Sequence, residues 1–159
     1  MQRETTGSVI IRRPPEEVFT YLRTYENEAA WEDFVLEARS EPPGPAEVGT
    51  RVHKVRRTPV GQDSFTIEVV ELDLAARRWV DVALDGDFKD TRIEWRVTPV
   101  DGGTRVDVKV ELHAHGLWKR LLRLVRRTAL HQLATALESL RRVLEAGGAT
   151  TPAAPVAAP

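Results

Sequence analysis

The sequence predicts an α+β domain in which a curved antiparallel sheet wraps around one long C-terminal helix. From Leu117 to about Ala146 neither Gly nor Pro interrupts the chain, and a helix of that length would be roughly 45 Å long. Apolar residues recur along it at helical spacing, namely at Trp118, Leu122, Val125, Ala129, Leu133, Ala136, Leu140 and Val143. The segments before it alternate apolar and polar residues, which is typical of strands with one dry face.

The first third of the chain predicts a strand followed by two short helices. Thr5–Ile11 is rich in β-formers, and Pro15 with the acidic residues after it suits the first turn of a helix. Asn27 can cap a second short helix, from Glu28 to about Asp33. Phe34–Ala38 then looks extended.

A meander of strands follows, separated by turn-forming Pro, Gly and Asp residues. The runs are Arg51–Thr58, Ser64–Leu72, Arg78–Leu84, Thr91–Thr98 and Thr104–Leu112. The last two alternate most cleanly, which predicts that six side chains face the long helix: Ile93, Trp95, Val97, Val106, Val108 and Val110.

Length and composition predict one domain over residues 1–148 and a disordered Pro/Ala-rich tail over residues 149–159. The chain has no Cys, and no apolar run approaches a membrane span, so a cytoplasmic protein without an integral membrane segment is expected. The formal net charge of −1 and the lack of aromatic residues among the basic ones argue against nucleic acid. Residues 117–146 nevertheless carry seven Lys/Arg against two Glu, which makes one basic helix face.

The order of elements and several short motifs resemble the polyketide cyclase/dehydrase and lipid-transport family of the START and birch-pollen-allergen (SRPBCC) superfamily. The matching segments are Pro15–Phe19, Trp31, Val48–Arg51, Glu68–Leu72, Trp95–Pro99, Gly103–Val106 and Leu117–Leu144. The resemblance implies a helix-grip fold with a hydrophobic ligand between the sheet and the long helix. Some members are cyclases or dehydratases, and others are carriers or regulators.

The residues offer few candidates for catalysis, and no nucleophile or phosphate-binding motif is present. Asp81 would face the interior if Trp79 and Ala83 do, but the alternation alone favours the opposite register, with Val80 and Val82 inward. His53 lies between apolar strand residues and could also point inward. The His113-x-His115 pair has only Glu111 nearby as a possible third ligand, and all three are expected on the solvent-exposed face of the strand. Neither a metal nor another cofactor is therefore expected.

Four Trp in a small domain predict wide apolar walls, and the start of the long helix is apolar over a broader arc than one packing stripe requires. We therefore expect a ligand cavity between the first half of the helix and the sheet. Its expected lining is Trp31, Trp79, Trp95, Trp118, Leu121, Leu122 and Val125.

Three functions are compatible with these features. The first is the binding of a hydrophobic small molecule such as a lipid, an isoprenoid or a polyketide. The second is enzymatic cyclisation or dehydration of a polyketide-like substrate, with a buried polar group moving protons. The third is a regulatory or partner-binding role for the basic helix face. The lack of a clear inward acid–base pair favours the first; the ligand's identity and the oligomeric state are left open.

Overall fold

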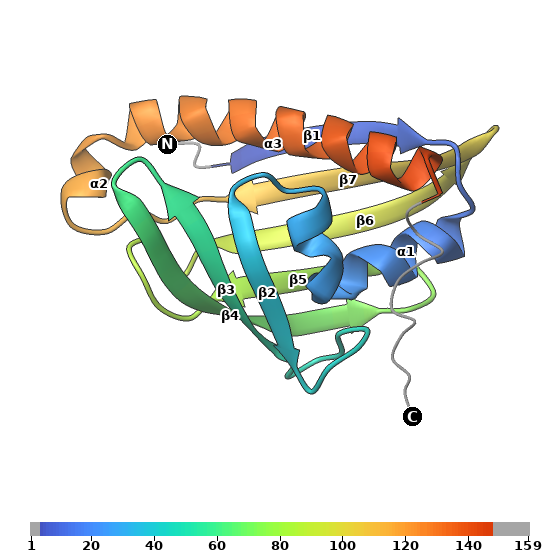
Figure 1. The fold of residues 1–159 in the computed structure, drawn as a ribbon, viewed down its shortest axis with the longest axis horizontal. Helices are drawn as coiled ribbons and strands as arrows, with labels where there is room; N and C mark the ends of the chain where they lie inside the picture. The colour runs from blue at the N-terminus through green and yellow to red at the C-terminus, as the bar shows by residue number, and fades with distance from the viewer. Residues whose placement is uncertain (1–3, 148–159) are drawn as a thin grey trace.

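The computed structural model describes residues 4–147, and its strands form a single antiparallel sheet that curves beneath a long helix (Figure 1). The strand order is β1-β7-β6-β5-β4-β3-β2. The strands are β1 (Glu4–Ile11), β2 (Val35–Glu41), β3 (Arg51–Thr58), β4 (Gly61–Asp73), β5 (Arg78–Ala83), β6 (Arg92–Val100) and β7 (Gly103–Glu111). The predicted architecture is confirmed, and the predicted strands agree with the observed ones to within a few residues.

The two short helical segments follow β1, as expected. Helix α1 (Pro15–Arg23) has Pro15 in its first turn and packs against β6 and β7. The second segment is the 3₁₀ helix η1 (Tyr25–Ala30), so the predicted helix over Glu28–Asp33 is wrong in its position. Asn27 lies inside η1, and its side chain donates to the carbonyl of Tyr21 in α1 (3.1 Å) instead of capping a new helix.

The long C-terminal helix is divided in two by Leu121. Helix α2 (Leu117–Arg120) and helix α3 (Leu122–Glu145) replace the single helix predicted from the sequence, and Leu121 has non-helical angles (φ −100°, ψ 18°). The indole of Trp118 donates to Oδ2 of Asp87 (3.0 Å) and its ring packs on Phe88. These contacts hold α2 against the β5–β6 loop and off the axis of α3.

The concave face of the sheet carries the main core. Trp95, Val97, Val106 and Val108 are buried there, with Ile93 and Val110 partly buried beside them, which confirms the predicted inward set. Helix α3 packs along β1, where Gly7 allows a close approach, since a Cβ at this position would lie 2.9 Å from Cδ2 of Leu133. The helix residues that close the core are Ala136, Leu137, Leu140 and Leu144.

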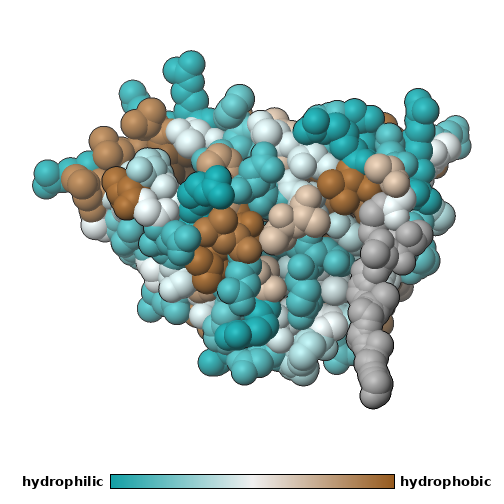
Figure 2. Space-filling view, viewed as in Figure 1, coloured by the Kyte–Doolittle hydropathy of each residue, from teal (hydrophilic) through white to brown (hydrophobic). Residues whose placement is uncertain are grey.

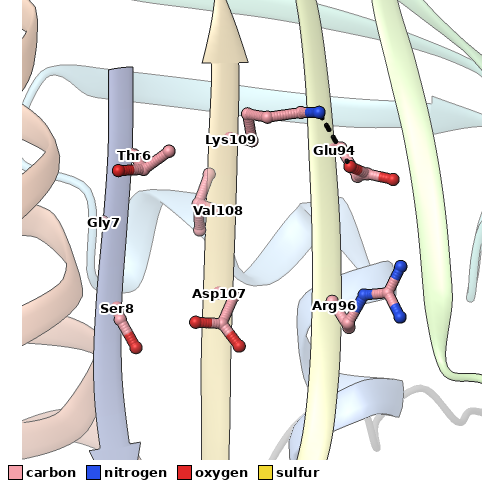
Figure 3. A pocket seen from close by; sticks show the side chains of 8 residues that line it. All are labelled: Thr6, Gly7, Ser8, Glu94, Arg96, Asp107, Val108 and Lys109. Carbon is pink, nitrogen blue, oxygen red and sulfur yellow. Dashed lines mark ion pairs between the residues drawn. The ribbon is translucent and has the colours of Figure 1, made fainter. Parts of the chain in front are cut away.

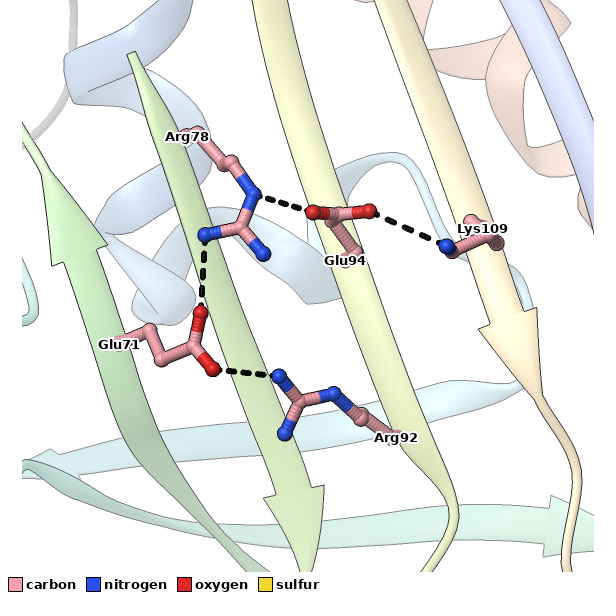
Figure 4. Close-up of polar contacts among 5 residues, drawn as sticks. All are labelled: Glu71, Arg78, Arg92, Glu94 and Lys109. Carbon is pink, nitrogen blue, oxygen red and sulfur yellow. Dashed lines mark hydrogen bonds and ion pairs between the residues drawn. The ribbon is translucent and has the colours of Figure 1, made fainter. Parts of the chain in front are cut away.

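The convex face is polar and carries a chain of ion pairs across β4, β5, β6 and β7 (Figure 4). Glu71 pairs with Arg78 and Arg92, and Glu94 pairs with Arg78 and Lys109. Glu71 and Glu94 are the register partners of Val80, which is fully buried although it lies on this face. The paired side chains, with their hydrocarbon portions, therefore cover the middle of β5 and bury Val80.

The predicted Pro/Ala-rich tail lies outside the described residues, and with it the predicted boundary at residue 148. Across residues 4–147, no helix has the length and the apolar composition needed to cross a membrane.

Candidate functional site

The centre of the concave face carries one buried carboxyl group, that of Asp81 on β5. The side chain is only 2% exposed, and Trp79 and Ala83 on the same face are buried with it. The register favoured by the sequence, with Val80 and Val82 inward, is therefore wrong. Both faces of β5 are covered, one by the core and the other by the ion pairs, so Val80 is buried without facing the interior.

Asp81 is held by hydrogen bonds from two aromatic residues. The Tyr25 hydroxyl donates to Oδ2 of Asp81 (2.7 Å), and Nε1 of Trp95 donates to the same oxygen (3.3 Å). Nε1 of Trp79 donates to the Tyr25 hydroxyl (3.2 Å), so Trp79, Tyr25 and Asp81 form a short chain of hydrogen bonds. Oδ1 of Asp81 accepts no hydrogen bond from residues 4–147.

Burial raises the pKa of Asp81 to about 6, because the interior disfavours the charged carboxylate. The charge of Lys54 and the hydrogen bond from Tyr25 act in the opposite direction and limit the rise. The pKa of Tyr25 is raised well above its ordinary value by burial and by the neighbouring Asp81. Near neutral pH Asp81 is therefore the group of this pair that titrates, while Tyr25 keeps its proton.

A second group of charges lies next to this pair. Nζ of Lys54 on β3 is 2.9 Å and 2.8 Å from the two carboxylate oxygens of Glu28 on η1, and it lies 5.1 Å from the centre of the Tyr25 ring. The side chains of this ion pair are only 9% and 12% exposed. Burial, together with the charge of Glu28, raises the pKa of Glu32 to about 7. Lys54 therefore lies near three carboxyl groups, those of Glu28, Glu32 and Asp81, and the last two titrate close to neutral pH.

Three of the four Trp form the wall of this site. The rings of Trp79 and Trp95 are stacked, with centroids 5.6 Å apart and planes 4° apart. Trp31 meets Trp95 edge-on at 6.4 Å. All three are buried, whereas Trp118 is 40% exposed and lies apart from them on α2. The structure therefore brings together three of the four predicted Trp.

The histidines do not join the site. Both ring nitrogens of His53 are engaged on the outer face, with the Thr66 hydroxyl (3.0 Å) and the Glu41 carboxylate (2.9 Å), so His53 does not point inward. His113 contacts Glu111, and His115 is exposed and contacts the carbonyl of Lys89. In the part of the chain that the structure describes, no three His, Cys, Asp or Glu gather closely enough to hold a metal ion.

The first half of the long helix is poorly covered. No residue from Leu117 to Thr135 is buried, whereas four residues from Ala136 to Leu144 are. Of the predicted lining residues on this stretch, Leu121 is 40% exposed, and Leu122 and Val125 are only partly buried.

The pockets that the structure shows lie elsewhere. One of about 340 Å³ is on the convex face, where Thr6, Ser8, Glu94, Arg96, Asp107 and Lys109 direct polar groups into it (Figure 3). Another adjoins the turn before α1 and Gly102–Gly103. Neither lies beneath α3, and the cavity expected there stays a prediction.

Sequence reasoning missed Tyr25, Glu28 and Lys54 as site residues. Lys54 had a usable signal, since it is two residues from the buried Val52 and therefore lies on the same, inward face of β3. Tyr25 carries no comparable signal in the sequence. Its hydrogen bond to Asp81 joins residues 56 positions apart, which no local pattern reveals.

The curved seven-stranded sheet and the long C-terminal helix together define a helix-grip fold. The chain belongs to the polyketide cyclase/dehydrase and lipid transport family, which matches residues 2–145. Family and fold together indicate a domain that binds a hydrophobic ligand.

Solved structures show the same fold at low sequence identity. TTHA0849 from Thermus thermophilus is 22% identical over 91% of this chain and 98% of that one, with a TM-score of 0.77. The di-domain ARO/CYC BexL from the BE-7585A biosynthetic pathway is 19% identical over 91% of this chain and 47% of its own (TM-score 0.73). A START superfamily protein from Mycobacterium smegmatis is 16% identical over 89% and 98% (TM-score 0.66). A comparison with curated proteins finds no match.

Proposed function

We propose that this protein binds a lipid, isoprenoid or polyketide-like molecule between the concave face of the sheet and the first half of the long helix. The observation that carries the proposal is the difference between the two halves of that helix. The same apolar stripe runs along both, yet only the second half is buried. An apolar stripe that is only partly covered, next to an apolar sheet face, suits an apolar ligand.

The hydrogen-bonded pair of Asp81 and Tyr25 at the centre of the sheet favours a ligand that also carries an oxygen-containing group. Asp81 lies on the strand row that continues through Ile93 and Val110 to Thr5. Arg126 of α3 donates to the carbonyl of Glu4, next to Thr5 (3.2 Å). The first half of α3 therefore lies over the end of the row of residues that contains Asp81. The free Oδ1 of Asp81 suits a hydroxyl or carbonyl group of the ligand.

Ligand binding can be tested by fluorescence titration and by native mass spectrometry of the purified protein. An apolar fluorescent probe such as 1-anilinonaphthalene-8-sulfonate should saturate near one equivalent and quench the emission of the buried Trp. Val125→Trp should weaken probe binding at little loss of stability, because unfilled space accepts volume that a packed core does not. Leu140→Trp, at a fully buried position of the same helix, is the matched control and should destabilise the fold. Absence of saturable binding, with destabilisation by both variants, would refute the proposal.

The second candidate function is a cyclase or dehydratase, and the observation in its favour is the Asp81–Tyr25 pair. A carboxyl group with a pKa of about 6 can take a proton from carbon next to a carbonyl and return it to a departing hydroxyl group, which leaves as water. Conversion of an aromatic polyketide precursor by the parent protein, lost in Asp81→Asn while probe binding is kept, would establish the enzyme. Binding without conversion in either protein would favour the carrier.

A further inference from the structure

One end of the molecule gathers exposed apolar side chains. Ten large apolar residues are exposed within residues 4–147, and six of them are at the end formed by α2 and the β3–β4 turn: Phe34, Val60, Leu117, Trp118, Leu121 and Leu124. We call these six residues the apolar tip. Figure 2 shows brown groups at the side where Figure 1 places α2.

Three contacts bring the members of the apolar tip to one end of the fold. Trp118 packs on Phe88 with ring centroids 6.1 Å apart, and the guanidinium of Arg56 lies 5.7 Å from the centre of the Phe88 ring. Arg56 is near the end of β3, just before the turn that carries Val60. The amide of Arg57 donates to the carbonyl of Phe34 (2.7 Å), which places the start of β2 at the same end.

Basic side chains surround the apolar tip on the helix side. From Leu117 to Leu137 the chain contains no acidic residue and five basic ones: Lys119, Arg120, Arg123, Arg126 and Arg127. None of the five forms an ion pair with another residue in the range 4–147. At the far end of α3 the arrangement differs, since Arg141 pairs with both Glu138 and Glu145.

The β5–β6 loop borders the tip with opposite charge. The loop has three acidic residues, Asp85, Asp87 and Asp90, and one basic residue, Lys89. Asp87 accepts a hydrogen bond from the Trp118 indole. Asp90 is 3.7 Å from His115, and the backbone amide of Thr66 donates to Asp85. These acids limit the basic surface to the α2 and α3 side, where the five basic residues outnumber them.

We infer that the apolar tip and the adjoining basic residues dock this protein on an anionic lipid bilayer. Nucleic acid or an acidic protein would use the cations but would gain little from exposed Leu and Val at the end of a hairpin and a helix. A bilayer uses both, because apolar side chains enter the headgroup region while Lys and Arg attract anionic lipids. The inference rests on the outer surface and holds whether or not the interior binds a ligand.

The primary experiment is co-sedimentation of the full chain with phosphatidylcholine vesicles, with and without phosphatidylserine. We expect binding to the vesicles that contain phosphatidylserine and weak binding to phosphatidylcholine alone. Trp118 is the one exposed Trp in the described range, so its emission should shift to the blue on binding. Trp118→Phe should abolish most of that shift. Failure to bind phosphatidylserine vesicles at low salt would overturn the inference.

Two pairs of substitutions test the two parts of the surface separately. Arg120→Gln with Arg123→Gln should lower the partition coefficient by about 25-fold, since each cation near an anionic leaflet contributes roughly fivefold. Leu117→Ser with Leu124→Ser should lower it by at least about tenfold, because both side chains are expected to enter the bilayer. All four residues are exposed, so the thermal stability should change little.

The matched controls lie away from the tip. Arg39→Gln with Arg142→Gln changes the net charge equally at two other exposed positions, and Leu74→Ser removes an equally exposed Leu at the opposite end of β4. Both controls should bind like the parent protein. If they lose as much binding as the tip variants, the attraction is unspecific and the inference is wrong. If the charge pair matters and the Leu pair does not, the protein adsorbs to the bilayer by charge alone, and the inference that the apolar tip enters the bilayer is wrong.

Discussion

Tyr25 and Asp81 are 56 residues apart in the chain and are joined by a 2.7 Å hydrogen bond in the centre of the fold. Tyr25 belongs to η1 and Asp81 to β5, so the bond ties the helical segment after α1 to the middle strand of the sheet. Both side chains are buried, and the same hydroxyl accepts from the indole of Trp79. The site is therefore also part of the structure that holds the concave face together.

Replacing Tyr25 with Phe should lower the free energy of unfolding by about 1–3 kcal/mol, since the change leaves buried polar groups without a partner. Oδ2 of Asp81 would keep only the bond from Trp95, and the indole of Trp79 would lose its acceptor. Urea denaturation measures the loss. Tyr21→Phe is the control, because Tyr21 is equally buried and its hydroxyl forms no hydrogen bond with residues 4–147. Equal losses in the two variants would mean that the Tyr25–Asp81 bond adds no stability.

The pH dependence of stability should carry the signature of Asp81. Its pKa in the folded protein, about 6, is above its ordinary value of 3.8, so between these values the folded state binds more protons than the unfolded state. The contribution of Asp81 to stability is therefore present at low pH and is lost as the pH rises through about 6.

Asp81→Asn removes this titration while keeping the shape of the side chain. The stability of the variant relative to the parent protein should rise by about 1–3 kcal/mol between roughly pH 4 and pH 7, as expected for a shift of this size. Urea denaturation across that range measures the difference. A difference that does not change with pH would show that Asp81 titrates normally in the folded state.

The contact between β1 and α3 depends on the absence of a side chain at Gly7. A Cβ there would lie 2.9 Å from Cδ2 of Leu133 and 3.0 Å from Cδ1 of Leu137. Gly7→Val should therefore destabilise the fold by about 1–3 kcal/mol through overpacking. Shortening Leu133 to Ala in the same chain should recover part of the loss, which a double-mutant cycle of unfolding free energies measures. Strict additivity of the two changes would contradict close packing at this point.

The fold was predictable from the sequence because its signals are local and repeated. Ile93, Trp95 and Val97 alternate with polar residues on β6, and the helix stripe has the period of an α-helix. Turn residues marked nearly every strand boundary. The break at Leu121 was not predictable, because it follows from the contacts of Trp118 with Asp87 and Phe88 on a distant loop.

The interior site was predictable only in part. The buried Trp residues were expected as walls, but the orientation of Asp81 was not, because Val80 and Asp81 are both buried and point to opposite faces of β5. Alternation distinguishes the faces of a strand only where one of them is wet. Here the ion pairs of Glu71 and Glu94 cover the outer face, and that cover depends on side chains from four strands.

The core on the concave face should not tolerate a charge. Val108 is 2% exposed and lies in the register row that joins Gly7 to Trp95, between the sheet and the buried half of α3. Val108→Asp places a carboxyl group there without a partner, and the cost of burying it should unfold the domain or leave it neutral and strongly destabilised. Circular dichroism with thermal denaturation measures the effect. Val60→Asp is the control, since Val60 is 97% exposed and should accept the same change with little loss of stability. A Val108→Asp protein that melts with the parent would mean that this face of β7 is wet and that α3 does not cover it.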